Sequence, residues 1–453
     1  MLLFRKIILL YLFLLCTVGV VGQINVTEIE QQFGKGELVL KKRISIRFFL
    51  DKESNTYKAK VNHQVQKIVI NNKNETKNGL IQIPFNEFQE LKLLRARYFE
   101  LDSIGNKILK ENVKVKYADV KDYFINNIFY SDLKVKQFKC SVDLKDTYLV
   151  DYSYELIYSD LKFLTSFYFQ NHFEGVQDVK ITVFKNPHIN FSIYPYHVSD
   201  IEISESDKQI SYQGLKLKRY KESEFSIGGS YYLPHIVLSV HHVIIEEDTT
   251  TVLNTIDDLY NWYYSLINQL EPDTAVINNL CKTIINDNDD DVVKIDKIFK
   301  WVQQNINYVA FENGIAGFKP MEADRVAYLK FGDCKGIANL LVNLLKAAGF
   351  DARHVWLGTK SIQYNYDIPS LVVDNHMICG LFFENKIYYL DGTSKTAFWN
   401  NVPSHIEGKE VLIGNGNYYT IGTIKESSAH ENNIRIKGVL DLTVKNPIGY
   451  IRS

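Results

Sequence analysis

The sequence has little net charge and lacks a second long apolar run. Its 453 residues include 52 lysines and arginines against 53 aspartates and glutamates, a net charge of −1. A nearly neutral chain without a basic stripe gives no reason to expect a nucleic-acid ligand. Beyond residue 22 no apolar run approaches the roughly 20 residues that cross a bilayer. We therefore expect no integral membrane span once a leader is removed.

Cysteine is also scarce. The chain has five cysteines, none in Cys-x-x-Cys spacing, and four of them follow residue 22: Cys140, Cys281, Cys334 and Cys379. Their dispersed positions do not resemble a disulfide framework, and zinc or redox interpretations are weak. Cys281 and Cys379 lie in apolar patterns and are predicted to be buried thiols. We expect no cofactor and no metal.

The N-terminus predicts export. Arg5 and Lys6 precede an apolar run from Ile7 to Val21, and Gly22 follows. This order is typical of a signal peptide over residues 1–22, with cleavage near Gln23. The expected location is periplasmic or extracellular, with an uncleaved anchor as the alternative.

Residues 23–248 predict an antiparallel β-sandwich, with an open barrel as the alternative. The chain is rich in aromatics, with 29 tyrosines and 26 phenylalanines, which suits β structure. Short alternating segments are separated by turn-forming stretches such as 71–74 and 185–187, with no helical pattern between them. This region is interpreted as either a binding module or a scaffold.

The pattern changes near Thr249, and residues 249–424 predict a mixed α+β domain. Helical spacing covers 253–270, 275–285 and 289–306, while 354–359 and the segments bearing His376 and Asp391 read as strands. The final segment, 425–453, becomes β-like again and predicts the start of a C-terminal β unit. The complete chain is thus expected to be α+β with two or three domains.

Cys334 is the most informative residue. The apolar stripe that follows it predicts a helix, for which Asp333 is a plausible N-cap and Gly349 a plausible end. Unpaired backbone N–H groups at a helix start favour a thiolate and can also stabilise an oxyanion. This position suits a nucleophile, although a buried and inert thiol remains the alternative.

A histidine and an aspartate follow in neighbouring strands. If Glu384-Asn385 forms a two-residue loop, Asp391 pairs opposite Ile378, and His376 lies on the same face one diagonal step away. Diagonal neighbours are about 7–8 Å apart at the backbone, close enough for a carboxylate to orient an imidazole. His376 as a satisfied core residue and Asp391 as a turn residue remain alternatives. Together with Cys334 they supply the parts of a nucleophilic cysteine site.

Three motifs carry a resemblance to a known superfamily. Gly332-Asp333-Cys334-Lys335-Gly336-Ile337-Ala338-Asn339-Leu340-Leu341 resembles the nucleophile helix of transglutaminase-like (papain-related) cysteine proteins, and Asn375-His376-Met377-Ile378 and Leu390-Asp391-Gly392-Thr393 resemble their histidine and aspartate strands. More closely, the chain resembles bacterial exported proteins in which an N-terminal β domain (DUF3857) precedes this core.

The resemblance implies a catalytic triad. Cys334 would be the nucleophile, His376 the general base and acid, and Asp391 the group that orients the imidazole. Gly336 departs from the pattern, because relatives commonly carry an acidic residue there. Tyr308 and Asn313 are candidates for a second oxyanion donor.

The resulting prediction is an exported cysteine-dependent amide hydrolase or acyltransferase that forms a thioester. Its substrate would be a peptide or protein amide, with a cell-envelope peptide as one candidate. The alternative is a non-catalytic envelope binding or assembly module that retains the fold. A carbohydrate-binding envelope protein is a third interpretation, based on the aromatic-rich β half.

Overall fold

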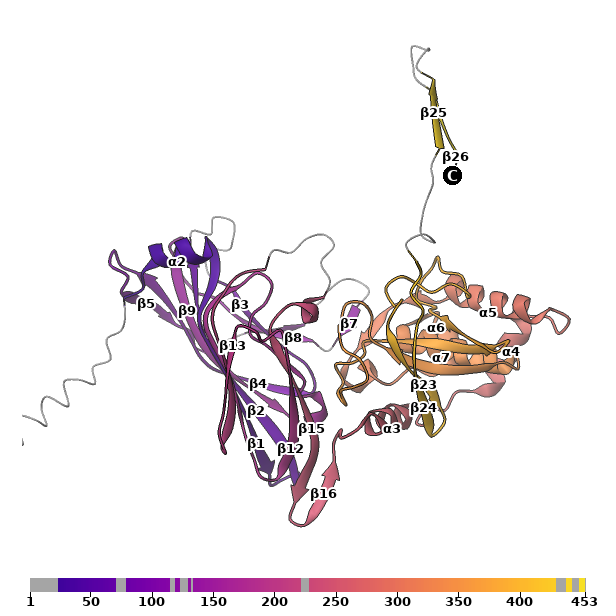
Figure 1. The fold of residues 1–453 in the computed structure, drawn as a ribbon, viewed down its shortest axis with the longest axis horizontal. Coiled ribbons are helices and arrows are strands. Elements are labelled where there is room, and N and C mark those ends of the chain that lie inside the picture. The colour runs from indigo at the N-terminus through magenta and orange to yellow at the C-terminus, as the bar shows by residue number, and fades with distance from the viewer. Residues whose placement is uncertain are drawn as a thin grey trace, which may run out of the picture. The chain divides into compact units, whose positions relative to one another are not determined.

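The protein was analysed as a computed structural model that describes residues 23–70, 79–114, 119–122, 129–131, 133–220, 228–428, 437–441 and 448–452. The chain forms two units (Figure 1). The first contains residues 1–259, 310–318 and 368–372, and the second contains 260–309, 319–367 and 373–453. The units interleave along the sequence, and the contiguous limits 23–248 and 249–424 stay a prediction.

The predicted signal peptide, residues 1–22, lies outside the described residues. Within the described ranges, no helix is both long enough and apolar enough to cross a membrane.

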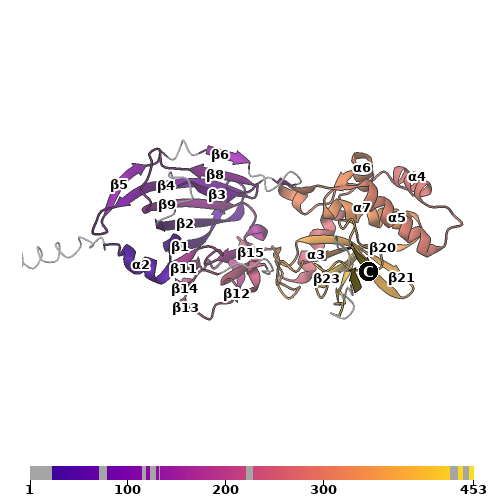
Figure 2. The ribbon, with the colours of Figure 1, turned by 90° about the horizontal axis from the view of Figure 1, so that it is seen from above.

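Long amphipathic strands build the first unit. In β1 (Gly36–Asp51) the buried Ile44, Ile46 and Phe48 alternate with more exposed neighbours, so one face of the strand packs inward. Figure 2 displays β1, β2, β9 and β4 side by side. The eight-stranded sheet has the order β13 (Ile201–Glu205), β14 (Gln209–Leu217), β11 (Gly175–Phe184), β1, β2 (Thr56–Ile70), β9 (Tyr148–Tyr158), β4 (Gln89–Leu101), β5 (Lys107–Asn112).

A second, smaller sheet completes a β-sandwich. Ile236, Leu238 and Val240 from its central strand join Val61 and Ile181 of the large sheet in one buried cluster. The second sheet has the order β10 (Ser166–Tyr168), β15 (His235–Ile245), β12 (Ile189–Tyr196), and β16 (Asp248–Thr251) also pairs with β15.

Smaller elements of the first unit include two further sheets. One has the order β3 (Ile81–Phe85), β8 (Lys134–Phe138), β6 (Asp119–Asp122), and the other pairs β7 (Phe129–Ser131) with β18 (Ala310–Glu312).

Two features of the first unit differ from the sequence prediction. A helix, α2 (Val26–Phe33), begins it, where Asn25 Oδ1 accepts a hydrogen bond from Glu28 N at 3.1 Å. In addition, β1 pairs with β11 in parallel, so the large sheet is not antiparallel throughout. Two strands can pair in parallel when the chain between them is long enough to return to the end of the sheet at which the first strand began.

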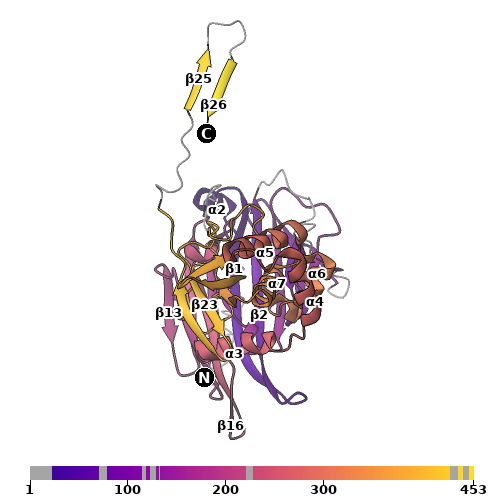
Figure 3. The same ribbon diagram turned by 90° about the vertical axis from the view of Figure 1, so that its right-hand side faces the viewer.

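The second unit is an antiparallel sheet covered by helices. Its sheet has the order β22 (Lys386–Leu390), β21 (His376–Phe383), β20 (Asp351–Leu357), β23 (Glu410–Asn415), β24 (Tyr418–Thr423). Figures 2 and 3 show the helices gathered along one side of this sheet. They are α4 (Thr274–Ile284), α5 (Asp291–Asn305), α6 (Ala323–Leu329) and α7 (Cys334–Ala347), and α3 (Ile256–Ile267) precedes them.

Helix α7 is the centre of the second unit's core. Ile337, Leu341, Leu344 and Leu345 are buried together with residues of α5 and of the sheet. The helix ends at Ala347, and Gly349 has the left-handed φ of 91° that favours glycine. The predicted helix after Cys334 is therefore confirmed, and α3, α4 and α5 confirm the three helices predicted before it.

The C-terminal segment forms a hairpin of β25 (Lys437–Asp441) and β26 (Ile448–Arg452). The whole chain is α+β, as the sequence predicts.

Candidate active site

Cys334 is the first residue of α7. The preceding Asp333 is the N-cap, and its Oδ1 accepts a hydrogen bond from Gly336 N at 2.8 Å. The Cys334 side chain is half-buried, whereas Cys281 and Cys379 are buried as predicted. The thiol thus lies at the positive end of the helix dipole, which favours a negative charge.

A buried ion pair lies at this helix start. Asp333 and Lys335, both buried, form a salt bridge through Asp333 Oδ2. The Lys335 cation neutralises the Asp333 carboxylate. A thiolate at Cys334 would therefore not be repelled by an unpaired negative charge next to it.

Gly336 lies close to α6. A side chain at this position would bring its Cβ to 3.2 Å from Val326 Cγ2. The glycine therefore permits close packing of α6 on α7.

The hairpin of β21 and β22 has the predicted register. Cys379 pairs with Leu390, and Phe383 pairs with Lys386, which leaves Glu384 and Asn385 as the loop. Both loop residues have positive φ, 49° and 59°, as a type I′ turn requires. The predicted two-residue loop is confirmed, and Asp391 follows directly after β22.

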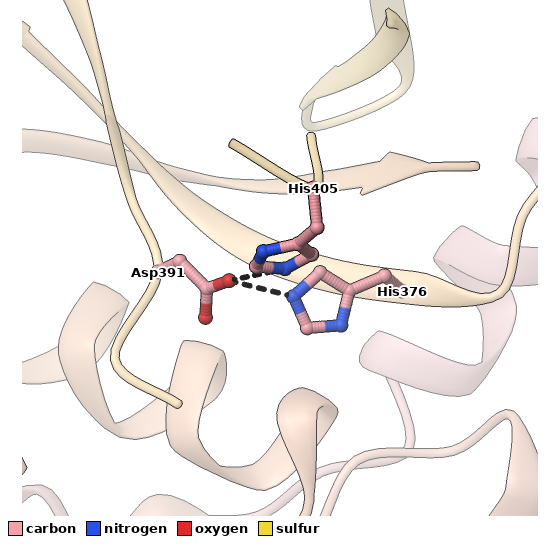
Figure 4. Close-up of side chains that lie close together, drawn as sticks. All are labelled: His376, Asp391 and His405. Carbon is pink, nitrogen blue, oxygen red and sulfur yellow. Dashed lines mark hydrogen bonds and ion pairs between the residues drawn. The ribbon is translucent and has the colours of Figure 1, made fainter. Parts of the chain in front are cut away.

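His376 and Asp391 meet through a hydrogen bond. His376 Nε2 lies 3.0 Å from Asp391 Oδ2, and the Asp391 side chain is fully buried (Figure 4). The other carboxylate oxygen, Oδ1, accepts from Thr393 N at 3.0 Å and from Thr393 Oγ1 at 2.6 Å. Thr393 thereby fixes the carboxylate while Oδ2 stays directed at the imidazole.

The charges of these groups depend on each other. Burial opposes protonation of His376, but the hydrogen bond and charge of Asp391, and then those of Cys334, outweigh it and raise the pKa of His376 to about 10. Burial raises the pKa of Asp391, but His376 and the hydrogen bonds from His405 and Thr393 bring it well below its ordinary value. A protonated His376 imidazole beside an ionised Asp391 carboxylate is the arrangement favoured here.

The structure brings the three predicted residues together. Asp391 is hydrogen bonded to His376, and Cys334 lies near enough to His376 to contribute to the raised pKa of the imidazole. Of the two candidates for a second oxyanion donor, Tyr308 lies in β17 (Asn307–Tyr308) beside Gly332 of β19 (Phe331–Gly332). Asn313 belongs to a segment of the first unit.

The residue before His376 fixes the start of its strand. Asn375 Oδ1 accepts from Thr359 N at 2.9 Å, and Asn375 Nδ2 donates to Ser361 Oγ at 3.0 Å. The loop after β20 is thereby tied to the first residue of β21.

The chain after Asp391 is anchored from α5. Gln303 is buried, and its Nε2 donates to the carbonyls of Ser394 at 2.7 Å and Ala397 at 2.8 Å. This contact holds the loop that begins at the orienting carboxylate.

Sequence reasoning missed His405. Its Nε2 lies 3.2 Å from Asp391 Oδ2, so two imidazoles share one carboxylate oxygen (Figure 4). His405 lies in the segment between β22 and β23, and its side chain is 46% exposed. No helical or strand pattern marks it, so only its contact in the folded chain distinguishes it from the other ten histidines.

Chemically, the arrangement can activate a thiol. A carboxylate that holds an imidazole beside a cysteine at a helix start is the geometry of nucleophilic acyl transfer.

Comparison with known proteins agrees with this fold. Residues 278–387 match the family described as the transglutaminase-like superfamily. No curated protein matches the chain. A solved structure named "putative protease" from Parabacteroides distasonis matches with a TM-score of 0.63 and 14% identity, over 86% of this chain and 72% of its own.

Two other solved structures match less of the chain. A "putative cysteine protease" from Cytophaga hutchinsonii aligns at 14% identity over 51% of this chain and 71% of its own, with a TM-score of 0.23. A structure named "TGase" aligns at 10% identity over 49% of this chain and 52% of its own, with a TM-score of 0.21. The Parabacteroides protein shares the fold of this chain, and the match over residues 278–387 shows a transglutaminase-like core.

Proposed function

We propose that this protein is an exported cysteine-dependent amide hydrolase or acyltransferase that acts on peptide or protein amides. The observation that carries the proposal is the 3.0 Å bond from His376 to the buried Asp391, together with the interaction of Cys334 with His376, which helps to raise the pKa of the imidazole. Because Nε2 is engaged by Asp391, Nδ1 is the nitrogen left for the thiol.

The first half-reaction would form a thioester. The Cys334 thiolate attacks the amide carbonyl carbon, and the negative charge that develops on the carbonyl oxygen lies near the first N–H groups of α7. His376 then gives its proton to the leaving amine, and the carbon–nitrogen bond breaks.

The second half-reaction would release the acyl group. His376, now neutral, takes a proton from water as its oxygen attacks the thioester, which yields the carboxylic acid and regenerates the thiol. An amine in place of water would give acyl transfer. We favour hydrolysis because no channel for an acceptor amine is evident from the sequence.

The alternative function is a non-catalytic envelope module that retains the fold. It would be favoured by a thiol sealed from solvent or by side chains that point apart. Cys334 is half-buried rather than sealed, and His376 and Asp391 are hydrogen bonded. These observations favour the enzyme.

The proposed location and architecture rest on the N-terminal half of the sequence. Residues 1–22 support export to the periplasm or beyond, and the first unit is proposed to be of the DUF3857 type. The mass of the mature protein from a periplasmic fraction tests the first point, because cleavage near Gln23 removes residues 1–22.

Selective alkylation tests the chemistry. Iodoacetamide at neutral pH should label Cys334 much faster than a free cysteine, while the buried Cys281 and Cys379 stay unlabelled as internal controls. His376→Ala should slow the reaction. Labelling of Cys334 at the rate of a free cysteine, unchanged by His376→Ala, would refute the proposal.

The reaction type needs a second assay. A peptide mixture is incubated with the protein and a fluorescent primary amine, with Cys334→Ser as the control. Cleaved peptides that depend on Cys334 indicate hydrolysis, and amine incorporation indicates acyl transfer.

A further inference from the structure

His376, Asp391 and His405 form a cluster whose composition goes beyond the needs of a triad. The Nε2 atoms of both histidines lie 3.0 and 3.2 Å from Asp391 Oδ2, and all three atoms lie within 4.8 Å of one another. Figure 4 shows the two imidazole rings converging on the same carboxylate oxygen.

Hydrogen bonding by itself gives no need for the second imidazole. Asp391 Oδ1 already accepts two bonds from Thr393, and Oδ2 accepts one from His376. His405 is 46% exposed and adds a fourth donor to a fully buried carboxylate that already has three. A second imidazole is therefore more than the orientation of His376 requires.

The spacing suits a zinc ion. Zinc binds histidine nitrogen and carboxylate oxygen at about 2.0–2.2 Å, which places tetrahedral ligands about 3.3–3.6 Å apart. The two nitrogen–oxygen distances in the structure, 3.0 and 3.2 Å, are a few tenths of an ångström shorter, and the His405 side chain is 46% exposed, so an outward rotation of its ring would lengthen them. Thr393 already orients the carboxylate ligand, as outer partners do in metal sites.

We propose that His376, Asp391 and His405 bind Zn²⁺, with solvent in the fourth position, and that the bound ion reversibly inactivates Cys334. The ion takes the place of the proton between His376 Nε2 and Asp391 Oδ2, and that proton leaves to solvent. His405 binds as the tautomer that carries its proton on Nδ1.

Inactivation follows from the loss of a proton site. With Nε2 on the metal, His376 keeps one proton on Nδ1 and cannot accept another from the thiol or from water. The inactivation rests on the proposed function, whereas zinc binding itself does not.

Zinc binding is measured first without any reaction. The full chain is freed of metal with EDTA, dialysed, and titrated with ZnCl₂ by calorimetry. Cobalt(II) serves as a second probe, because a tetrahedral site gives visible absorption bands. We expect one equivalent to bind to the wild type and to Cys334→Ser, because the thiol is not a ligand.

Two histidine variants define the site. His405→Gln keeps a hydrogen-bond donor for Asp391 but supplies a poor zinc ligand, so the affinity should fall by at least about tenfold. His188→Ala removes an exposed histidine of the first unit and should leave binding unchanged. Equal zinc affinity of His405→Gln and the wild type, or no binding to the wild type, would overturn the site.

Alkylation of Cys334 then tests the inactivation. Zinc should slow labelling of the wild type and of His188→Ala, EDTA should restore it, and His405→Gln should be insensitive to zinc. Rapid metal-free labelling that zinc does not slow refutes the inactivation and leaves the proposed function intact. Slow metal-free labelling together with one bound equivalent of zinc refutes the proposed function and leaves the site intact.

Discussion

Substitution of Asp391 by asparagine separates the charge of the carboxylate from its shape. An asparagine that keeps both Thr393 bonds through Oδ1 would present its NH₂ group to the histidines, where Oδ2 now accepts from them. His376 Nε2 would then have to accept a hydrogen bond, so its proton would move to Nδ1. The imidazole could no longer take the proton of Cys334.

The size of the effect follows from the bond that is lost. A hydrogen bond to a charged group contributes about 1.5–3 kcal/mol, equivalent to about 10- to 160-fold in rate or equilibrium. The upper end is capped, because an ordinary cysteine with a pKa of about 8.5 is still about 3% thiolate at pH 7. Alkylation of Cys334 in Asp391→Asn should therefore be about 10- to 30-fold slower than in the wild type.

The assay is iodoacetamide labelling at pH 7 in EDTA, followed by mass spectrometry of the peptide that contains Cys334. Asp351→Asn is the matched control, because Asp351 is exposed at the start of β20 and pairs with Arg353 at 2.6 Å. It should label at the wild-type rate. If Asp391→Asn is folded and labels within about twofold of the wild type, the argument that Asp391 sets the state of His376 is wrong.

Three further predictions concern stability, each measured by urea denaturation. Gln303→Met should lower the free energy of unfolding by about 1–3 kcal/mol, because two loop carbonyls lose their donor. The control is Gln304→Met, which changes an exposed neighbour and should leave the stability nearly unchanged. Equal effects of the two variants would contradict the anchoring role of Gln303. Asp333→Ala should lower the free energy of unfolding by more than the about 1 kcal/mol that an ordinary N-cap contributes, because the buried Lys335 loses its partner. This loss should be smaller when Asp333→Ala is combined with Lys335→Met. Losses that simply add in the double variant would argue against the ion pair. Burial and then the charge of Lys346 lower the pKa of His354 from 6.5 to about 3, so its stabilising contribution is complete above pH 6.5 and is lost as the pH falls toward 3. His354→Gln should therefore reduce the slope of unfolding free energy between about pH 6 and pH 4 by up to about 1.4 kcal/mol per pH unit, and parallel curves would show that His354 does not remain neutral in the folded protein.

Local rules were sufficient for much of the candidate site. The N-cap at Asp333, the apolar stripe after Cys334 and the glycine at 349 together specify α7 from a short segment of sequence. The register that aligns His376 with Asp391 depends only on a two-residue turn and on the alternation of side chains in a strand. Each of these features involves only a few neighbouring residues, whose types strongly favour one local backbone conformation.

Contacts between distant segments were outside the reach of these rules. The parallel pairing of β1 with β11 joins strands separated by more than a hundred residues, and neither strand carries a signal for its direction. Local sequence patterns also give no sign that residues 310–318 and 368–372 belong to the first unit. Such pairings are chosen by the total burial that they allow.

The amino-acid sequence by itself determined which side chains could form a nucleophilic site, because caps, turns and alternation fix each one on its own element. Only the tertiary structure decided that both Asp391 and Cys334 act on His376, and that His405 shares the same carboxylate oxygen. The reason is physical: a helix start, a hairpin and a loop meet through packing of the whole core, and no segment encodes that meeting alone.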